Sequence, residues 1–290
     1  MSSMKSAECA TAPDRIIGHV GLPGLGVSLI LAVCLLPQPA PATTRPVRVG
    51  LFGDSLAVQA ERYVDLLIQA RGKAAVSNFT YGGTAACDWL PAMRRFARTD
   101  HPQAVVLEFA GNTFSPCMLG YAAHLRTSVR LYCSAISQAI QAFLTMGTHV
   151  FLVRTPITRN EWVTHDRDWN DLNNAFATLA AQHPNRVADV DAGRSVEGPH
   201  HSFVSTMACM YFEPCSGPTI AGVKTDVVRS PDGIHFCPTN TGAGNGRVGR
   251  CPVYSSGAFR FAAAMAGPVI RQLHLSGTRA TNTTTSAPAK

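Results

Sequence analysis

The chain has 290 residues, of which 46% are hydrophobic and 15% are charged. This balance excludes a disordered protein and fits a globular chain with one large domain or two small ones. The net charge is +7, but only four of the 25 basic residues are lysine, the arginines are scattered, and no run of five like charges occurs. We therefore expect no nucleic-acid partner.

The N-terminus has the pattern of an export signal. Two basic residues precede an apolar stretch, Gly21–Leu36, and the small-residue sequence Ala40-Pro41-Ala42 follows it. This order predicts that residues 1–42 are a secretory signal peptide and that the mature chain starts near Thr43. A retained N-terminal anchor is the alternative, because residues 16–36 are about long enough to span a bilayer. Both interpretations place the protein outside the cytoplasm, either secreted or in the cell envelope.

Beyond the leader, β-rich runs alternate with runs of helical periodicity. Five runs are expected to be strands: Arg48–Phe52, Ala74–Phe79, Ala104–Phe109, His149–Val153 and Arg186–Val190. Five are expected to be helices: Leu56–Arg71, Pro91–Arg98, Ser128–Met146, Asp171–Gln182 and Ser255–Leu275. The alternation predicts one α/β domain, residues 43–275, with a mainly parallel five-stranded sheet between two helical layers. We expect residues 276–290 to be a disordered tail and the protein to be a monomer.

Four short motifs lie in loops that follow these strands. They are Gly53-Asp54-Ser55, Gly82-Gly83, Gly111-Asn112 and Asp232-Gly233-Ile234-His235. In an open parallel sheet the loops beyond the carboxyl ends of the strands gather at one edge, where ligands bind. The sequence therefore predicts that the four motifs meet at that edge.

Three of these residues have the chemistry of a nucleophile and its base. A serine hydroxyl needs a base that takes its proton during attack. Ser55 follows a strand at a turn into a helix, His235 can act as the base, and Asp232 can orient the imidazole. Serine is also a common helix cap, so the hypothesis depends on the motifs meeting in space.

The remaining motifs can supply hydrogen-bond donors to an oxyanion. The Ser55 N–H opens a helix, a glycine allows the backbone to approach a substrate closely, and the Asn112 side chain carries an amide. We expect Ser55, Gly83 and Asn112 to form an oxyanion hole. A tight turn at Gly82 and Gly83 and a loop asparagine are the ordinary alternatives.

The cysteines favour an oxidising compartment. Seven lie beyond residue 42, and their proximity predicts the pairs Cys209–Cys215, Cys237–Cys251 and Cys87–Cys117. Cys133 is left over in a helical apolar pattern, so we expect a buried free thiol there. Two long Gly-, Pro- and Cys-rich stretches, residues 195–230 and 237–252, are expected to be disulfide-braced loops at the rim of a cleft.

Together the four motifs resemble the conserved blocks of the SGNH (GDSL-type) hydrolases, over residues 47–275. The resemblance implies a flavodoxin-like three-layer α/β/α sandwich. It also implies that Ser55 is the nucleophile, His235 the base and Asp232 its orienting residue. Ser55, Gly83 and Asn112 would form the oxyanion hole. In the second block a threonine replaces the usual first glycine, which leaves the choice between Gly83 and Gly82 open.

The sequence therefore predicts a secreted serine esterase or deacylase that needs no metal or organic cofactor. Its substrate would be a carbohydrate O-acyl ester, an envelope lipid ester or a small acyl ester, with transient association with a membrane or the cell wall. Trp89, Trp162 and Trp169 are candidates for stacking on sugar rings, with packing at the rim as the equal alternative. Three other hypotheses stay open: an envelope O-acyltransferase with the same site, a non-catalytic envelope-binding protein, and a metal-dependent hydrolase that uses His200, His201 and Asp232.

Overall fold

A computed structural model describes residue 9 and residues 46–109, 111–118, 125–164, 168–239 and 249–275. Within these ranges the side chains of residues 125–127, 162–164 and 168–170 are not described. Most of the predicted leader and the predicted tail therefore lie outside the described residues. In the part of the chain that is described, no helix is both long enough and apolar enough to cross a membrane.

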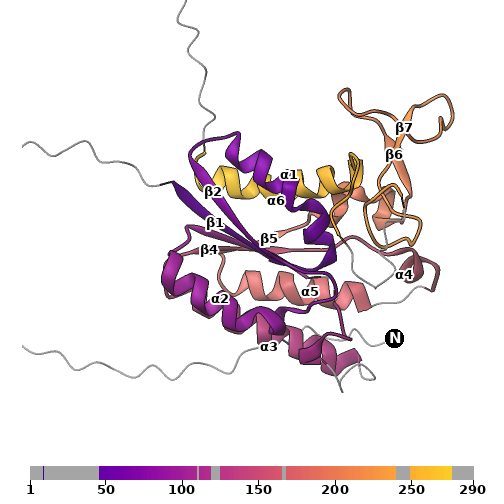
Figure 1. Cartoon of the computed structure of the whole chain (residues 1–290). Helices are drawn as coiled ribbons and strands as arrows, with labels where there is room; N and C mark the ends of the chain where they lie inside the picture. The colour runs from indigo at the N-terminus through magenta and orange to yellow at the C-terminus, as the bar shows by residue number, and fades with distance from the viewer. Residues whose placement is uncertain are drawn as a thin grey trace, which may run out of the picture.

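A five-stranded parallel sheet forms the centre of the molecule (Figure 1). Its strands are β1 (Val47–Gly53), β2 (Ala74–Thr80), β3 (Ala104–Glu108), β4 (His149–Val153) and β5 (Val187–Val190). They lie in the order β2-β1-β3-β4-β5, and every neighbouring pair is parallel. Gly53 at the end of β1 lies opposite Thr80 and Glu108, so the loops after three strands start level with one another.

Helices cover both faces of the sheet (Figure 1). One face packs against α1 (Ser55–Gln69) and α6 (Ser256–Gln272), and the other against α2 (Ala86–Asp100), α3 (Leu125–Leu144) and α5 (Asp168–Ala181). The prediction of a three-layer α/β/α sandwich with a parallel five-stranded sheet is confirmed.

The alternation of side chains along the strands explains the two layers. In β1, Leu51 contributes to the core beneath α1 and α6, whereas Phe52 contributes to the core beneath α2 and α3. In β3, Val106 and Leu107 divide in the same way. Successive residues of a strand point to opposite faces, so a central strand with a helical layer on each side is apolar throughout.

Three parts of the fold differ from the sequence-based expectation. Helix α2 begins at Ala86, five residues before the predicted start at Pro91, because the Asp88 carboxylate accepts the Ala85 N–H at 2.8 Å and caps an earlier turn. The long stretch before the Asp-x-x-His motif contains a two-stranded antiparallel sheet of β6 (Thr206–Ala208) and β7 (Thr225–Val227). Short helical turns also occur outside the predicted elements: α4 (Arg159–Thr164), η2 (Pro116–Met118), η3 (Gly193–Val196) and η4 (Pro199–His201).

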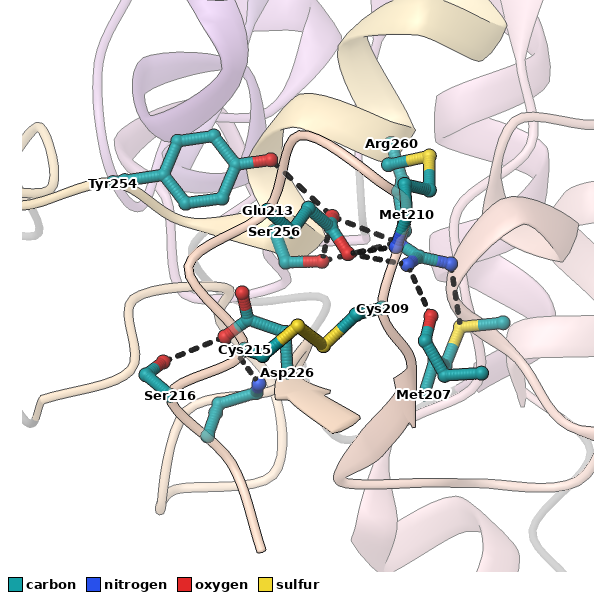
Figure 2. A network of polar contacts seen from close by, with 12 residues as sticks. Met207, Cys209, Met210, Glu213, Cys215, Ser216, Asp226, Tyr254, Ser256 and Arg260 are labelled. Carbon is teal, nitrogen blue, oxygen red and sulfur yellow. Dashed lines mark hydrogen bonds and ion pairs between the residues drawn. A yellow bond between two sulfur atoms is a disulfide. The ribbon is translucent and has the colours of Figure 1, made fainter. Parts of the chain in front are cut away.

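A buried carboxylate holds the segment between β6 and β7 against α6. Glu213 accepts hydrogen bonds from the Arg260 guanidinium at 2.7 Å, from Ser256 Oγ at 2.5 Å and from Tyr254 Oη at 3.2 Å. Figure 2 shows this network beside the Cys209–Cys215 disulfide. The segment is thereby fixed to the N-terminal part of α6 and the residues just before it.

The disulfides confirm three of the predicted pairs and contradict one prediction. Cys87–Cys117, Cys209–Cys215 and Cys237–Cys251 are bonded as expected. The prediction of a free thiol at Cys133 is wrong, because Cys133 is bonded to Cys9. Residue 9 belongs to the stretch predicted to be a leader, but in the structure that cysteine is buried in the core around α3.

Candidate active site

A tight turn between β1 and α1 presents Ser55. Asp54 is the N-cap of α1, and its carboxylate accepts the Leu56 N–H at 3.0 Å. A Cβ atom at Gly53 would lie 2.4 Å from the Ala57 Cβ and 2.7 Å from the Glu108 carbonyl oxygen, so glycine alone fits there. Ser55 is consequently the first residue of the helix, at the carboxyl edge of the sheet.

His235 and Asp232 complete a chain of hydrogen bonds that starts at Ser55. The distance between His235 Nε2 and Ser55 Oγ is 2.9 Å, and the distance between His235 Nδ1 and Asp232 Oδ2 is 2.7 Å. A carboxylate accepts, so Nδ1 carries the proton and Nε2 is left to accept the Ser55 hydroxyl proton. The three side chains that the sequence argument selected are therefore brought together.

The environment of Asp232 keeps its carboxylate charged. Partial burial acts to raise the pKa of Asp232, but hydrogen bonds from the His235 side chain and from the N–H groups of His235 and Ile234 outweigh it and hold the pKa below its ordinary value. Its Oδ1 accepts the two backbone N–H groups at 2.8 and 3.0 Å, while Oδ2 faces the imidazole. The carboxylate is thereby fixed in position and oriented toward Nδ1.

Backbone N–H donors lie beside Ser55. The Ser55 N–H lies at the first position of α1, where no intrahelical acceptor exists. Gly83 has a φ of +79°, a left-handed conformation that favours glycine. Neither N–H finds an acceptor within the described ranges. Gly82 does not have positive φ, which distinguishes the two glycines of this turn.

Asn112 lies close to the turn that carries Ser55, and both hydrogens of its side-chain amide already have acceptors. Its Nδ2 donates to Asp54 Oδ2 at 2.8 Å and to the Thr84 carbonyl oxygen at 3.0 Å. The amide has two hydrogens, so both are taken. Asn112 thus ties the loop after β3 to the loop after β2 and to the residue before Ser55.

A second buried carboxyl group supports the same turn. Glu108, the last residue of β3, is fully buried, and its Oε2 accepts the Ala57 N–H at 3.1 Å. Burial and then the charge of Asp54 raise the pKa of Glu108 well above its ordinary value. Sequence reasoning missed this residue, because a glutamate at the end of an apolar run shows no partner until the strands are paired.

A buried arginine lies behind the Asp-x-x-His segment. The Arg229 guanidinium lies over the rings of Phe203 and Phe236, and its Nη2 donates to the Ile157 carbonyl oxygen at 2.7 Å. Burial lowers the pKa of Arg229 to about 10, against the opposing charges of Glu197, Asp232 and Glu161, so it stays cationic at neutral pH. Its charge favours the ionised form of Asp232.

The other predicted residues are placed as follows. Trp89 is half-buried, its ring meets Phe52 edge-on, and its Nε1 donates to Thr84 Oγ1 at 2.9 Å. The side chains of Trp162 and Trp169 lie outside the described part. His201 Nδ1 lies 2.9 Å from the Glu197 carboxylate. Within the described ranges no cluster of three or more His, Cys, Asp or Glu residues could hold a metal ion.

Comparisons with known proteins found similar solved structures. An acylhydrolase candidate of Bacteroides fragilis has a TM-score of 0.47 at 15% identity, covering 82% of this chain and 92% of its own. A lipase/acylhydrolase from Enterococcus faecalis has a TM-score of 0.40 at 20% identity, covering 52% and 78%. A lipolytic candidate of the G-D-S-L family from Desulfitobacterium hafniense has a TM-score of 0.43 at 11% identity, covering 55% and 84%. No protein-family model and no curated protein matches the sequence.

Proposed function

We propose that this chain is a GDSL-type serine hydrolase that cleaves carboxylic esters through an acyl-enzyme on Ser55. The observation that carries the proposal is the hydrogen-bonded line from Ser55 Oγ through His235 to Asp232, with distances of 2.9 and 2.7 Å. Nucleophile, base and orienting carboxylate within hydrogen-bond reach are the geometric signature of such a site.

Acylation follows from this geometry. Ser55 Oγ attacks the ester carbonyl carbon while its proton passes to His235 Nε2, and Asp232 stabilises the resulting imidazolium. The C–O bond to the alcohol then breaks, and the imidazolium returns the proton to the departing alkoxide oxygen. Water repeats the sequence in deacylation: His235 takes a proton from water, the hydroxide attacks the acyl carbon, and Ser55 leaves as its alcohol.

Negative charge on the substrate oxygen is stabilised by the N–H groups of Ser55 and Gly83. Removing one preorganised donor of an oxyanion hole costs roughly 2.7–4 kcal/mol of transition-state stabilisation. Asn112 joins them when one amide hydrogen turns from the Thr84 carbonyl to the substrate oxygen, with Asp54 still holding the other. This exchange predicts that Asn112 contributes less to substrate binding than to the transition state.

Export supports a substrate outside the cytoplasm. The three disulfides that lie wholly beyond residue 42 fit an oxidising compartment, as an exported chain would meet. The proposed substrate class is an acyl ester of a carbohydrate, an envelope lipid or a small alcohol. An O-acyltransferase would use the same acyl-enzyme with a sugar hydroxyl in place of water, and product analysis with and without an acceptor alcohol separates the two.

The test is labelling with a fluorophosphonate, followed by peptide mapping, together with hydrolysis of p-nitrophenyl acetate. We expect the label on Ser55, no label on Ser55→Ala, and a loss of kcat of about 10⁴-fold or more in His235→Ala. Ser195→Ala and His201→Ala are matched controls, because Ser195 bonds to a backbone carbonyl oxygen and His201 to a carboxylate outside the site. A parent protein that is inert and unlabelled would leave the non-catalytic binding protein as the better hypothesis.

A further inference from the structure

One face of α1 carries three polar side chains, each one helical turn from the next: Ser55, Gln59 and Tyr63. Residues four apart on a helix lie above one another. All three side chains bond to the C-terminal part of the chain, at His235, at Phe236 and at Ser255 respectively. The nucleophile is therefore the first of three contacts that the same helix face makes with residues 235–255, two of them at His235 and Phe236 and the third at the N-cap of α6.

The middle contact is the shortest of the three. Gln59 Oε1 accepts the Phe236 N–H at 2.7 Å, compared with 2.9 Å for the contact at Ser55 and 3.0 Å for the contact at Tyr63. Gln59 is 3% exposed and Phe236 is fully buried. A buried backbone N–H needs an acceptor, so this bond fixes the peptide that directly follows His235.

The histidine segment has little other regular structure to hold it. It lies in turns and bends between β7 and α6. The Phe236 carbonyl oxygen accepts from Ser255 Oγ at 2.7 Å, and Cys237 is bonded to Cys251. The first contact fixes the segment to Ser255, the N-cap of α6, and the second fixes it to the loop before α6. The His235 carbonyl oxygen accepts the Ser230 N–H at 2.7 Å within the segment's own turn. Among the described residues, the bond from the Phe236 N–H to Gln59 is the backbone hydrogen bond that ties the peptide after His235 to the helix carrying the nucleophile.

We propose that Gln59 is a positioning residue that sets the His235 imidazole against the Ser55 hydroxyl. The inference rests on the proposed function and deepens it. Without the Gln59 acceptor, the Phe236 carbonyl oxygen still accepts the hydrogen bond from Ser255 Oγ, but the Phe236 N–H loses its hydrogen bond to α1. The backbone of His235 can then shift relative to Ser55, and a displacement of about 1 Å in a catalytic group can cost about 100-fold in rate.

The test compares three variants by kcat, KM and melting temperature on p-nitrophenyl acetate. Gln59→Leu removes the acceptor, and we expect kcat to fall about 10- to 100-fold with KM little changed. Gln59→Glu keeps an oxygen acceptor, and we expect it to recover most of kcat. Tyr63→Phe is the matched control, because it removes the bond one turn farther along the same face and should lower the melting temperature while leaving kcat near the parent value.

A crystal structure of Gln59→Leu adds a readout that does not depend on turnover, with a longer separation of Ser55 Oγ and His235 Nε2 expected. An active parent with an equally active Gln59→Leu overturns the positioning role alone, as does a folded Gln59→Glu that remains as slow as Gln59→Leu. A parent that neither hydrolyses the ester nor takes the phosphonate label overturns the proposed function, and the positioning role with it.

Discussion

Two buried carboxyl groups of different charge state support the turn that presents Ser55. Asp54 bonds to the Leu56 N–H and to the Asn112 amide, which are contacts of an ionised acceptor. Glu108 lies beneath the same turn, where burial and the Asp54 charge raise its pKa well above the usual value. The pair resembles other carboxyl pairs in which two like charges cannot both form, so that one member keeps its proton.

This difference predicts that Glu108 makes stability dependent on pH. Above the ordinary glutamate pKa of about 4.3 the unfolded chain releases the proton while the folded chain keeps it. The folded state then binds more protons, so stability falls as pH rises toward the folded pKa, by at most about 1.4 kcal/mol per pH unit. Glu108→Gln cannot titrate, and we expect its stability relative to the parent to be greater at pH 8 than at pH 5.

Urea unfolding of both proteins at the two pH values measures this difference. Glu108→Leu is the control, because it removes both the titration and the acceptor for the Ala57 N–H. We expect Glu108→Leu to be less stable than Glu108→Gln at both pH values. A difference between Glu108→Gln and the parent that stays constant from pH 5 to pH 8 would contradict a raised pKa.

At the scale of elements, the sequence predicts the strands that have a regular apolar pattern. It misses helix boundaries and short strands that are set by contacts with other parts of the chain. The bounds of the five parallel strands each lie within one residue of the expected position, because an apolar run between loops leaves little choice. Helix α2 starts at Ala86 and not at the expected Pro91, because the Asp88 carboxylate accepts the Ala85 N–H and caps an earlier turn. The strands β6 and β7 have three residues each and no strong pattern, and their pairing is fixed by the surrounding contacts.

The Glu213–Arg260 pair of Figure 2 joins the segment between β6 and β7 to α6. Among the contacts between elements, we expect this pair to contribute most to stability. The side chain of Glu213 is fully buried and that of Arg260 is 12% exposed. Removing one partner leaves the other charge buried, which costs about 3–5 kcal/mol. We therefore expect Glu213→Leu and Arg260→Met each to lower the free energy of unfolding by an amount in that range.

The double variant distinguishes a buried pair from two independent contacts. Replacing both charges by apolar side chains is often close to neutral, so Glu213→Leu/Arg260→Met should lose much less than the sum of the single losses. Arg48→Ala is the matched control, because Arg48 pairs with Asp100 at the surface and should cost about 1 kcal/mol or less. Additive losses in the urea unfolding of the double variant would contradict the coupling.

At the scale of the whole molecule, the sequence predicts which residues of the candidate site meet but not the residues that hold them in place. Ser55 and His235 are 180 positions apart, yet both follow from motifs at the ends of predicted elements. Gln59 meets Phe236 across 177 positions, and Glu108 meets Ala57 across 51. A lone glutamine in a helix or glutamate in a strand has no signature, because its role is defined by a distant backbone N–H. Such contacts become visible only after the chain has folded.

The Cys9–Cys133 disulfide joins the predicted leader to the core. We therefore expect residue 9 to contribute to the free energy of unfolding of the full chain. The bond closes a separation of 124 residues, and loss of a native disulfide costs about 2–5 kcal/mol. In the full-length protein, made in an oxidising compartment, Cys9→Ala should lower the free energy of unfolding by that amount. The double variant Cys9→Ala/Cys133→Ala should be no less stable than Cys133→Ala alone, because one bond is lost in both.

Cleavage of the predicted leader would remove Cys9 and so change the expected effect of these variants on stability. The intact mass of the purified protein shows whether cleavage has occurred. A chain that begins near Thr43 has no Cys9, so Cys133 should then be a free thiol. We expect a thiol reagent to label it after denaturation in the absence of reductant. In that shortened chain Cys133→Ala removes no bond and should cost only the packing of one buried sulfur, about 1 kcal/mol. A Cys9→Ala variant of the full chain that is as stable as the parent would contradict the bond. Cys133 would then be a buried thiol in both forms of the protein, and the core around α3 would fold without any contribution from the first 42 residues.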